Sequence, residues 1–160
     1  NHDWPHNNVV AYSTGEKWKF LVTDLDYSYK LKGAGASVNY LNEIFNNDEH
    51  ITTRLLNELL KHKEFTDKYI NRVCDLMNTS FSADSLGAKF SNLKDEFSKF
   101  VEIQNQRWPN TLTNWEEDTY VIERFVSRRS RFYYKYLKKY FNDQSAYLEI
   151  STSYQNRKLL

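Results

Sequence analysis

The hydrophobic pattern of the chain changes its period once, and this change constrains the fold most. Between residues 9 and 23 two β-prone runs, VVAY and KWKFLVT, lie on either side of a polar segment that contains Gly15, and in the second run Trp18, Phe20 and Val22 alternate with Lys17, Lys19 and Leu21. Alternation around a glycine-containing turn is typical of a β-hairpin. After residue 35 the apolar residues recur every three to four positions, which is the period of an amphipathic helix. The sequence therefore predicts a short hairpin followed by helices.

The helical part is predicted as one bundle over residues 36–142. Apolar stripes indicate helices at about residues 38–45, 51–60, 65–77 and 82–106, and a long last helix that ends near residue 141. Thr113 and Glu116 have the spacing of a capping box at the start of this last helix. Residues 143–160 are interpreted as a tail with a small strand. The predicted fold class is mostly α, a single domain with a short N-terminal hairpin packed on a helical bundle.

Composition and charge narrow the classes of function. The chain has 160 residues, of which 40% are apolar and 16% aromatic, enough for one domain with a buried core. Lys and Arg number 22 and Asp and Glu 21, so the net charge of +1 creates no overall attraction for nucleic acid or an anionic membrane. The apolar runs are far shorter than the ~20 residues that cross a bilayer.

Two carboxylates follow the predicted hairpin directly. In extended backbone Asp24 and Asp26 would project from the same face and could share one cation. Carboxylate oxygens suit Mg²⁺, Mn²⁺ or Ca²⁺ better than zinc. A D-x-D pair by itself is more often a solvated strand end, so a metal site here depends on further residues.

A second pair of candidates lies before the hairpin. The catalytic loop of protein kinases, H-R-D-L-x-x-x-N, places a metal-binding Asn five residues after the catalytic Asp. Asp3 and Asn8 have this spacing. A hairpin and then Asp24 and Asp26 follow, which is the order of parts in a kinase. The order and spacing together favour a kinase-like site more than any of these residues does alone.

Four segments cover nearly the whole chain and carry a family resemblance. They are NHDWPHNN at residues 1–8, KWKFLVTDLDYSY at 17–29, LLKHKEFTDKYINRVCDLMNTSFS at 59–82 and RWPNTLTNWEEDTYVIERFVSRRSRFYYKYL at 107–137. The combination includes the D-x-D after a tryptophan-bearing hairpin and an R-W before a helix that ends in an Arg-rich run. In these features the chain resembles the CotH kinase family, the spore coat protein H kinases.

The resemblance implies an atypical protein kinase that uses Mg²⁺ or Mn²⁺ with ATP and phosphorylates secreted or surface proteins such as spore coat proteins. It implies an extracellular, spore-surface or cell-envelope location. Carried over to this sequence, Asp3 corresponds to the catalytic Asp and Asn8 to the metal-binding Asn. Asp24 or Asp26 corresponds to the Asp of D-F-G, and which of the two is the main metal ligand stays open.

The chain also departs from the protein-kinase pattern. Asn1 and His2 stand where His-Arg would precede the catalytic Asp, and neither Asp of the D-x-D is followed by Phe-Gly. No Gly-rich phosphate loop and no nucleotide-anchoring Lys precede Asp3 in the sequence. The chain is therefore expected to be the carboxyl-terminal part of a kinase-like domain without its N-lobe, and to be inactive by itself.

Three other functions remain as alternatives. A nucleotide-sugar glycosyltransferase also uses D-x-D to hold a metal ion. A structural or interaction module of a coat or surface assembly would need no catalysis. Basic and aromatic residues interleaved on the last helix could bind nucleic acid, although this pattern is interpreted as a solvated helix face and nucleic acid is not an expected partner.

Overall fold

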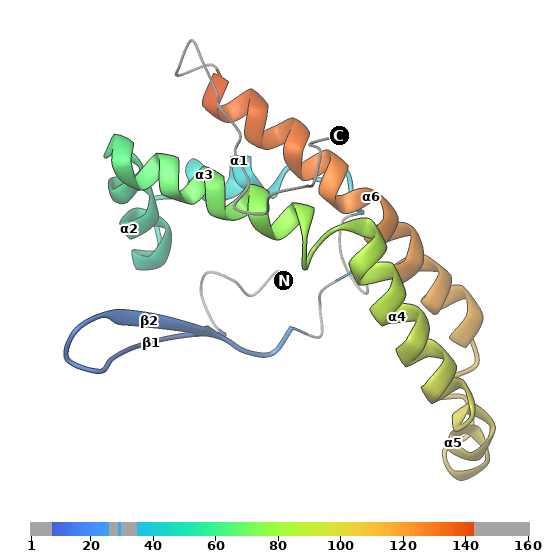
Figure 1. Cartoon of the computed structure of the whole chain (residues 1–160). Coiled ribbons are helices and arrows are strands. Elements are labelled where there is room, and N and C mark those ends of the chain that lie inside the picture. The colour runs from blue at the N-terminus through green and yellow to red at the C-terminus, as the bar shows by residue number, and fades with distance from the viewer. Residues whose placement is uncertain (1–7, 26–28, 30–34, 143–160) are drawn as a thin grey trace.

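The computed structural model describes residues 8–25, 29 and 35–142 (Figure 1). Its elements are β1 (Val9–Ser13), β2 (Trp18–Val22), α1 (Tyr40–Phe45), α2 (Ile51–Leu60), α3 (Lys63–Asn78), α4 (Ala83–Ser98), α5 (Val101–Arg107) and α6 (Trp115–Asn142). A hairpin followed by helices confirms the predicted mostly α fold class. Asp3, Asp26 and the predicted tail at residues 143–160 lie outside the described residues.

The hairpin forms where the period-two pattern predicts it. β1 and β2 pair antiparallel, with Val9 opposite Val22 and Ser13 opposite Trp18. Gly15 in the turn has a φ of 97°, a conformation that costs glycine little because it has no Cβ. Its backbone N–H donates to the Ser13 hydroxyl at 3.1 Å. The turn chemistry thus fixes the register of the two strands.

The apolar side chains of the hairpin remain exposed. Trp18 is 71% exposed, and Phe20 and Leu21 are each more than half exposed. Figure 1 shows the hairpin projecting away from the helices. The predicted packing of the hairpin on the bundle is therefore not seen in the described residues. The helices also leave apolar side chains exposed, since Ile51, Phe97 and Ile103 are each more than half exposed, so neither part covers the other's apolar residues.

The helix boundaries differ from the predictions at two places. The predicted helix over residues 82–106 is two helices, because the N–H of Phe100 donates to the carbonyl of Phe97 three residues earlier and tightens the chain into a turn. The last helix begins at Trp115, so Asn114 rather than Thr113 precedes it, and Glu116 pairs with Lys94 at 3.2 Å. The predicted start at Ser82 is confirmed, since its hydroxyl accepts a bond from the N–H of Ser85 at 3.2 Å.

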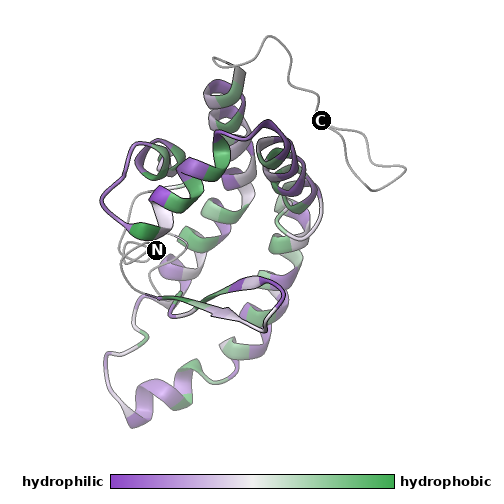
Figure 2. Ribbon diagram, turned by 90° about the vertical axis from the view of Figure 1, so that its left-hand side faces the viewer, coloured by the Kyte–Doolittle hydropathy of each residue, from purple (hydrophilic) through white to green (hydrophobic). Residues whose placement is uncertain are grey.

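The hydrophobic core lies between α1, α3 and α6, with α2 against it. Its fully enclosed members are Leu41, Phe45, Ile70, Cys74, Leu137 and Phe141. Phe45 contacts both Tyr140 and Phe141, with ring centroids 4.2 and 5.9 Å apart. Figure 2 shows apolar and polar residues alternating along the helices, as expected when each helix buries one face.

The helix α6 connects this core to the opposite end of the molecule. α4 lies along the first half of α6, and α5 forms the tip beyond them (Figure 1). Lys94 of α4 reaches both Glu116 and Glu123 of α6, at 3.2 and 3.3 Å. Although α6 is 28 residues long, none of the described helices combines the length and the apolar character needed to cross a membrane.

We expect Leu137→Ala to lower the free energy of unfolding by about 2–5 kcal/mol, because it leaves a cavity in a fully buried part of the core. Leu93→Ala is the matched control, since Leu93 is also helical but half exposed, and its effect should stay near 0.5 kcal/mol or less. Urea unfolding followed by circular dichroism measures both. Equal losses for the two variants would contradict this assignment of the core.

Candidate active site

Asn8 and Asp24, two of the predicted metal ligands, meet at the open end of the hairpin. Asn8 directly precedes β1, and Asp24 comes two residues after β2 ends. The Thr23 N–H donates to the Asn8 carbonyl at 2.9 Å, which extends the ladder beyond the strands. The Asn8 side-chain amide in turn donates to the Asp24 carbonyl at 3.4 Å. Residues sixteen positions apart in sequence are thereby held side by side.

Both residues have left-handed backbone conformations. The φ of Asn8 is 63° and that of Asp24 is 53°. Asn and Asp adopt this region more readily than other non-glycine residues, and such conformations concentrate at functional sites. The sequence prediction assumed extended backbone at Asp24 and Asp26, so that both would project from one face. This assumption is wrong at Asp24, whose backbone is left-handed. The backbone therefore departs from the extended conformation at both residues of the hairpin base.

The side chains of Asn8 and Asp24 carry oxygen atoms, which are the donors that a hard cation such as Mg²⁺ prefers. The carboxylate of Asp24 and the amide oxygen of Asn8 are oxygen donors, and the hydrogen bond to Asp24 uses the NH₂ of Asn8, the half of the amide that cannot bind a metal. Mg²⁺ usually takes one or two protein carboxylates and completes its shell with water and phosphate oxygens. Among residues 8–25, 29 and 35–142 no three His, Cys, Asp or Glu side chains converge on one point, so the described part of the chain offers two donors here.

The chain that follows the site is fixed on α6. The Tyr29 ring meets Phe125 edge-on, with centroids 5.6 Å apart. The guanidinium of Arg129 donates to the carbonyls of Ala36 at 2.8 Å and Val38 at 2.7 Å. Burial lowers the pKa of Arg129, yet a guanidinium stays charged at any physiological pH. These contacts connect the loop after Asp24 to the helical core.

Sequence reasoning grouped Arg129 with the solvated basic residues of the last helix and so missed this role. The signal was present in the spacing. Phe125, Arg129, Phe132 and Tyr136 follow one another at intervals of four, three and four residues, which places the arginine within an inward-facing stripe. A cation inside such a stripe must find acceptors, and Arg129 finds two backbone carbonyls.

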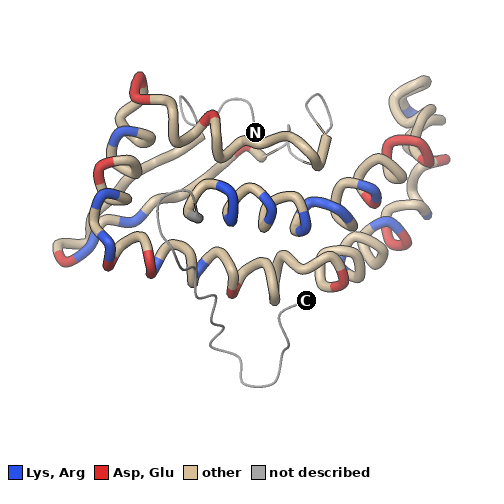
Figure 3. Tube along the Cα trace, turned by 90° about the horizontal axis from the view of Figure 1, so that it is seen from above, with Lys and Arg blue, Asp and Glu red and all other residues tan. Residues whose placement is uncertain are grey.

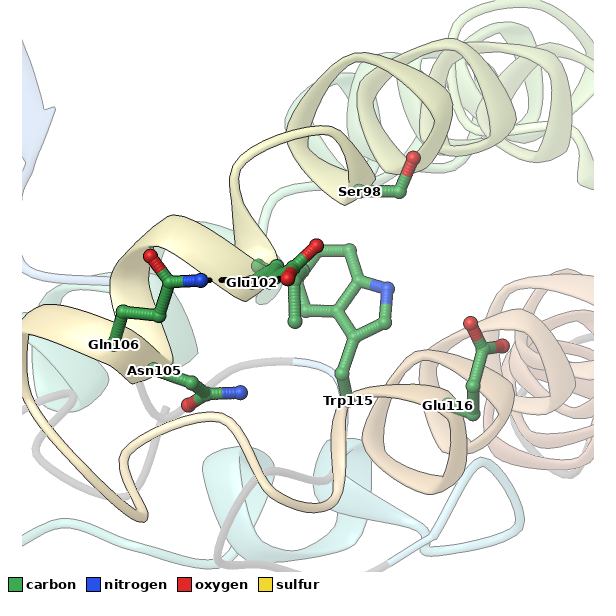
Figure 4. Close-up of a pocket in the computed structure, with 7 residues that line it drawn as sticks. Ser98, Glu102, Asn105, Gln106, Trp115 and Glu116 are labelled. Carbon is green, nitrogen blue, oxygen red and sulfur yellow. Dashed lines mark hydrogen bonds between the residues drawn. The ribbon is translucent and has the colours of Figure 1, made fainter.

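A pocket of about 620 Å³ lies at the other end of the molecule, where α4, α5 and α6 meet. Figure 4 shows the Trp115 indole between the side chains of Glu102, Ser98 and Glu116. Glu102 accepts a bond from Gln106 at 3.3 Å, and Glu116 pairs with Lys94. This pocket contains none of the predicted site residues, and two of its polar groups are already engaged by neighbours.

The single cysteine is a core residue. Cys74 is fully buried, and burial raises the pKa of its thiol to about 11. A thiol with that pKa is protonated at neutral pH and is a poor nucleophile. Cys74 is therefore not a candidate catalytic residue, and the candidate active site is the pair Asn8 and Asp24 at the hairpin base.

The fold and the site define a mostly helical protein with an oxygen-donor site at the base of a hairpin. Residues 1–133 match the family model described as CotH kinase protein. The chain therefore belongs to the CotH kinase family, and the resemblance seen in the sequence is confirmed. No curated protein and no solved structure matches the chain. Family membership makes the protein kinase-like, and kinases in general use ATP and a divalent metal ion.

Arg129→Lys should destabilise the fold by about 1–3 kcal/mol, because one terminal nitrogen of the guanidinium makes both bonds and the lysine side chain is one atom shorter, which leaves two part-buried carbonyls without their donor. Arg128→Lys, at the exposed neighbouring position, is the control and should have almost no effect. The midpoints of urea unfolding measure both changes. Similar midpoints for the two variants would show that Arg129 does not anchor the loop.

Asp24→Asn should keep the fold and weaken Mn²⁺ binding by about tenfold or more, because Asn tolerates the left-handed backbone but lacks the carboxylate charge. Asp95→Asn on α4 removes an equal charge from an exposed position far along the chain and should leave Mn²⁺ binding unchanged. Electron paramagnetic resonance of free Mn²⁺ during titration reports the affinity. Unchanged binding by Asp24→Asn would remove Asp24 from the metal site.

Proposed function

We propose that the protein is a phosphotransferase that moves the γ-phosphoryl group of ATP to a hydroxyl group on a secreted or surface protein. The observation that supports this most is the adjacency of Asn8 and Asp24 at the hairpin base. In a kinase, the Asn of the catalytic loop and the following metal-binding Asp share the same cations. The family match supports the same class of reaction.

The remaining proposed residues are kept near this pair by the chain itself. Asp26 is two residues from Asp24, and Asp3 is five residues from Asn8. Two residues span at most about 7 Å and five at most about 18 Å. These spans allow Asp26 to share a cation with Asp24 and allow Asp3 to reach the same substrate, as the proposed reaction requires.

Each residue has a role in the proposed reaction. Asp3 would orient the acceptor hydroxyl and take its proton while the bond from phosphorus to ADP breaks and the bond to the acceptor oxygen forms. Asn8 and Asp24, with Asp26, would hold Mg²⁺ or Mn²⁺. The bound metal ion supplies positive charge next to the phosphate oxygens. Whether Asp24 or Asp26 is the main ligand is a question for the single variants.

The proposed acceptor and location rest on the family match. The family is described as CotH kinase, and spore coat proteins are the expected acceptors. We therefore propose that the protein acts outside the cell, at a spore surface or cell envelope.

One observation favours a second candidate function, an interaction module in a coat or surface assembly. Both faces of the hairpin expose large apolar side chains, among them Trp18, Phe20 and Leu21. Contiguous exposed apolar surface is typical of contact sites between proteins. In this alternative the residues at the hairpin base would have no catalytic role.

The two functions give different results when phosphotransfer is measured for the unchanged protein and for Asp3→Asn. The amide keeps the shape of the carboxylate and loses its basicity, so we expect phosphotransfer to fall by ~10²- to 10⁴-fold with little change in nucleotide affinity. Transfer of radiolabelled phosphate from ATP to a coat-type acceptor is the measurement, and Asp95→Asn is the control with the same change of charge. Full activity of Asp3→Asn would exclude Asp3 as the base, whereas no transfer by the unchanged protein would favour the interaction module.

A further inference from the structure

From Arg124 onward α6 carries a continuous cationic surface that the proposed reaction does not use. Between Arg124 and Phe141 the sequence has seven Lys and Arg and no Asp or Glu. Six of these cations are exposed and form a surface that we call the α6 ridge, made of Arg124, Arg128, Arg131, Lys135, Lys138 and Lys139. Figure 3 shows the basic positions repeating along α6. Intervals of four and three residues place the ridge on one face, over about 22 Å.

The ridge concentrates six cations with no acidic residue between them in the sequence. Several lysines elsewhere pair with acids, as in Lys61–Glu58, Lys63–Asp67 and Lys68–Glu64. No ridge residue forms an ion pair with any residue that the structure describes. Like charges at three- and four-residue intervals destabilise a helix. The ridge is therefore electrostatically unfavourable by itself and complementary to an anionic partner.

The aromatic residues interleaved with the ridge in sequence are directed elsewhere in space. Tyr133, Tyr134, Tyr136 and Tyr140 pack against the hydrophobic core. The Tyr134 hydroxyl donates to Asn78 at 2.8 Å, and the Tyr136 hydroxyl donates to the Ser37 carbonyl. Binding of single-stranded nucleic acid usually needs exposed rings on which bases stack. The structure thus separates the cations from the tyrosines and disfavours that partner.

Two further occupants fit the ridge poorly. A helix that lies in a membrane surface buries an apolar face in the lipid, whereas the apolar face of α6, with Leu137 and Phe141, is enclosed in the core. A second copy of the chain that paired ridge to ridge would bring like charges together. An acidic stretch of polypeptide meets neither difficulty, because carboxylates on a flexible chain can follow the spacing of the ridge.

We propose that the α6 ridge docks an acidic stretch of the protein acceptor. The choice of an acceptor as the occupant rests on the proposed function. The charge complementarity rests on the structure alone. The same helix holds the loop that follows Asp24, through Arg129 and the carbonyls of Ala36 and Val38. A partner bound on the ridge therefore lies on a helix that also contacts residues 29, 36 and 38, which follow the candidate active site in sequence.

Binding of a fluorescein-labelled, Glu-rich peptide of about 16 residues, followed by fluorescence anisotropy, tests the proposal without nucleotide or transfer. Loss of phosphotransfer in the Asp3 variant therefore has no bearing on the outcome. The ridge variant changes Arg128, Arg131, Lys135 and Lys138 to Gln. The control variant changes four exposed cations outside the ridge to Gln, namely Arg54, Arg72, Lys89 and Lys99. The two variants remove equal numbers of Arg and Lys.

We expect the ridge variant to bind the acidic peptide at least about tenfold more weakly, and the control variant to differ from the unchanged protein by less than about threefold. A peptide with Gln in place of Glu should not bind. If the fourfold variant loses its helical circular dichroism signal, the pair Arg128→Gln and Lys135→Gln replaces it, with a smaller loss expected.

Three results would overturn the proposal. Equal weakening by the ridge and control variants would show that net charge, and not the ridge, attracts the peptide. Tighter binding of duplex or single-stranded DNA, or of phosphatidylserine–phosphatidylcholine vesicles, at the same ionic strength would assign the ridge to that partner instead. No binding of the acidic peptide at low salt would leave the ridge as a solvated surface.

Discussion

Burial of one face of α6 is the interaction on which the rest of the structure depends. Leu137 and Phe141 lie against Phe45 and Ile70, so α6 closes the core formed by α1 and α3. The first half of the same helix packs along α4, and a flank of it holds residues 36–38 through Arg129. One side of α6 makes all of these contacts. The side that faces away from them carries the six exposed cations of the α6 ridge.

The candidate active site depends on a different and more local constraint. The ladder of the hairpin places Asn8 opposite Thr23, and two left-handed residues turn the chain at either side of the hairpin base. This geometry requires no helix. Among the described residues, Tyr29 and Arg129 connect segments that follow Asp24 in sequence to the bundle. The hydrogen bonds of the hairpin base keep Asn8 and Asp24 together although the strands of the hairpin are exposed.

Much of the fold followed from periodicity, and the errors have identifiable causes. The break between α4 and α5 contains no Gly or Pro, since a three-residue hydrogen bond at Phe100 produces it. The conformation of Asp24 was missed because Asp is common in both extended and left-handed backbone. The sequence predicted Asn8 and Asp24 as candidate ligands by their order relative to the hairpin, and their adjacency follows from hairpin pairing. Their roles in catalysis remain proposals.

The sequence by itself determined the hairpin and most helices, because these arise from contacts between near neighbours in the chain. It also determined the family to which the chain belongs. The tertiary structure alone decided which cations of α6 face solvent and which is buried. Arg129 is anchored by carbonyls more than 90 residues earlier in the chain, while Arg128 beside it is exposed. No local pattern encodes such a contact directly, because its acceptors reach the helix only after the intervening helices have packed.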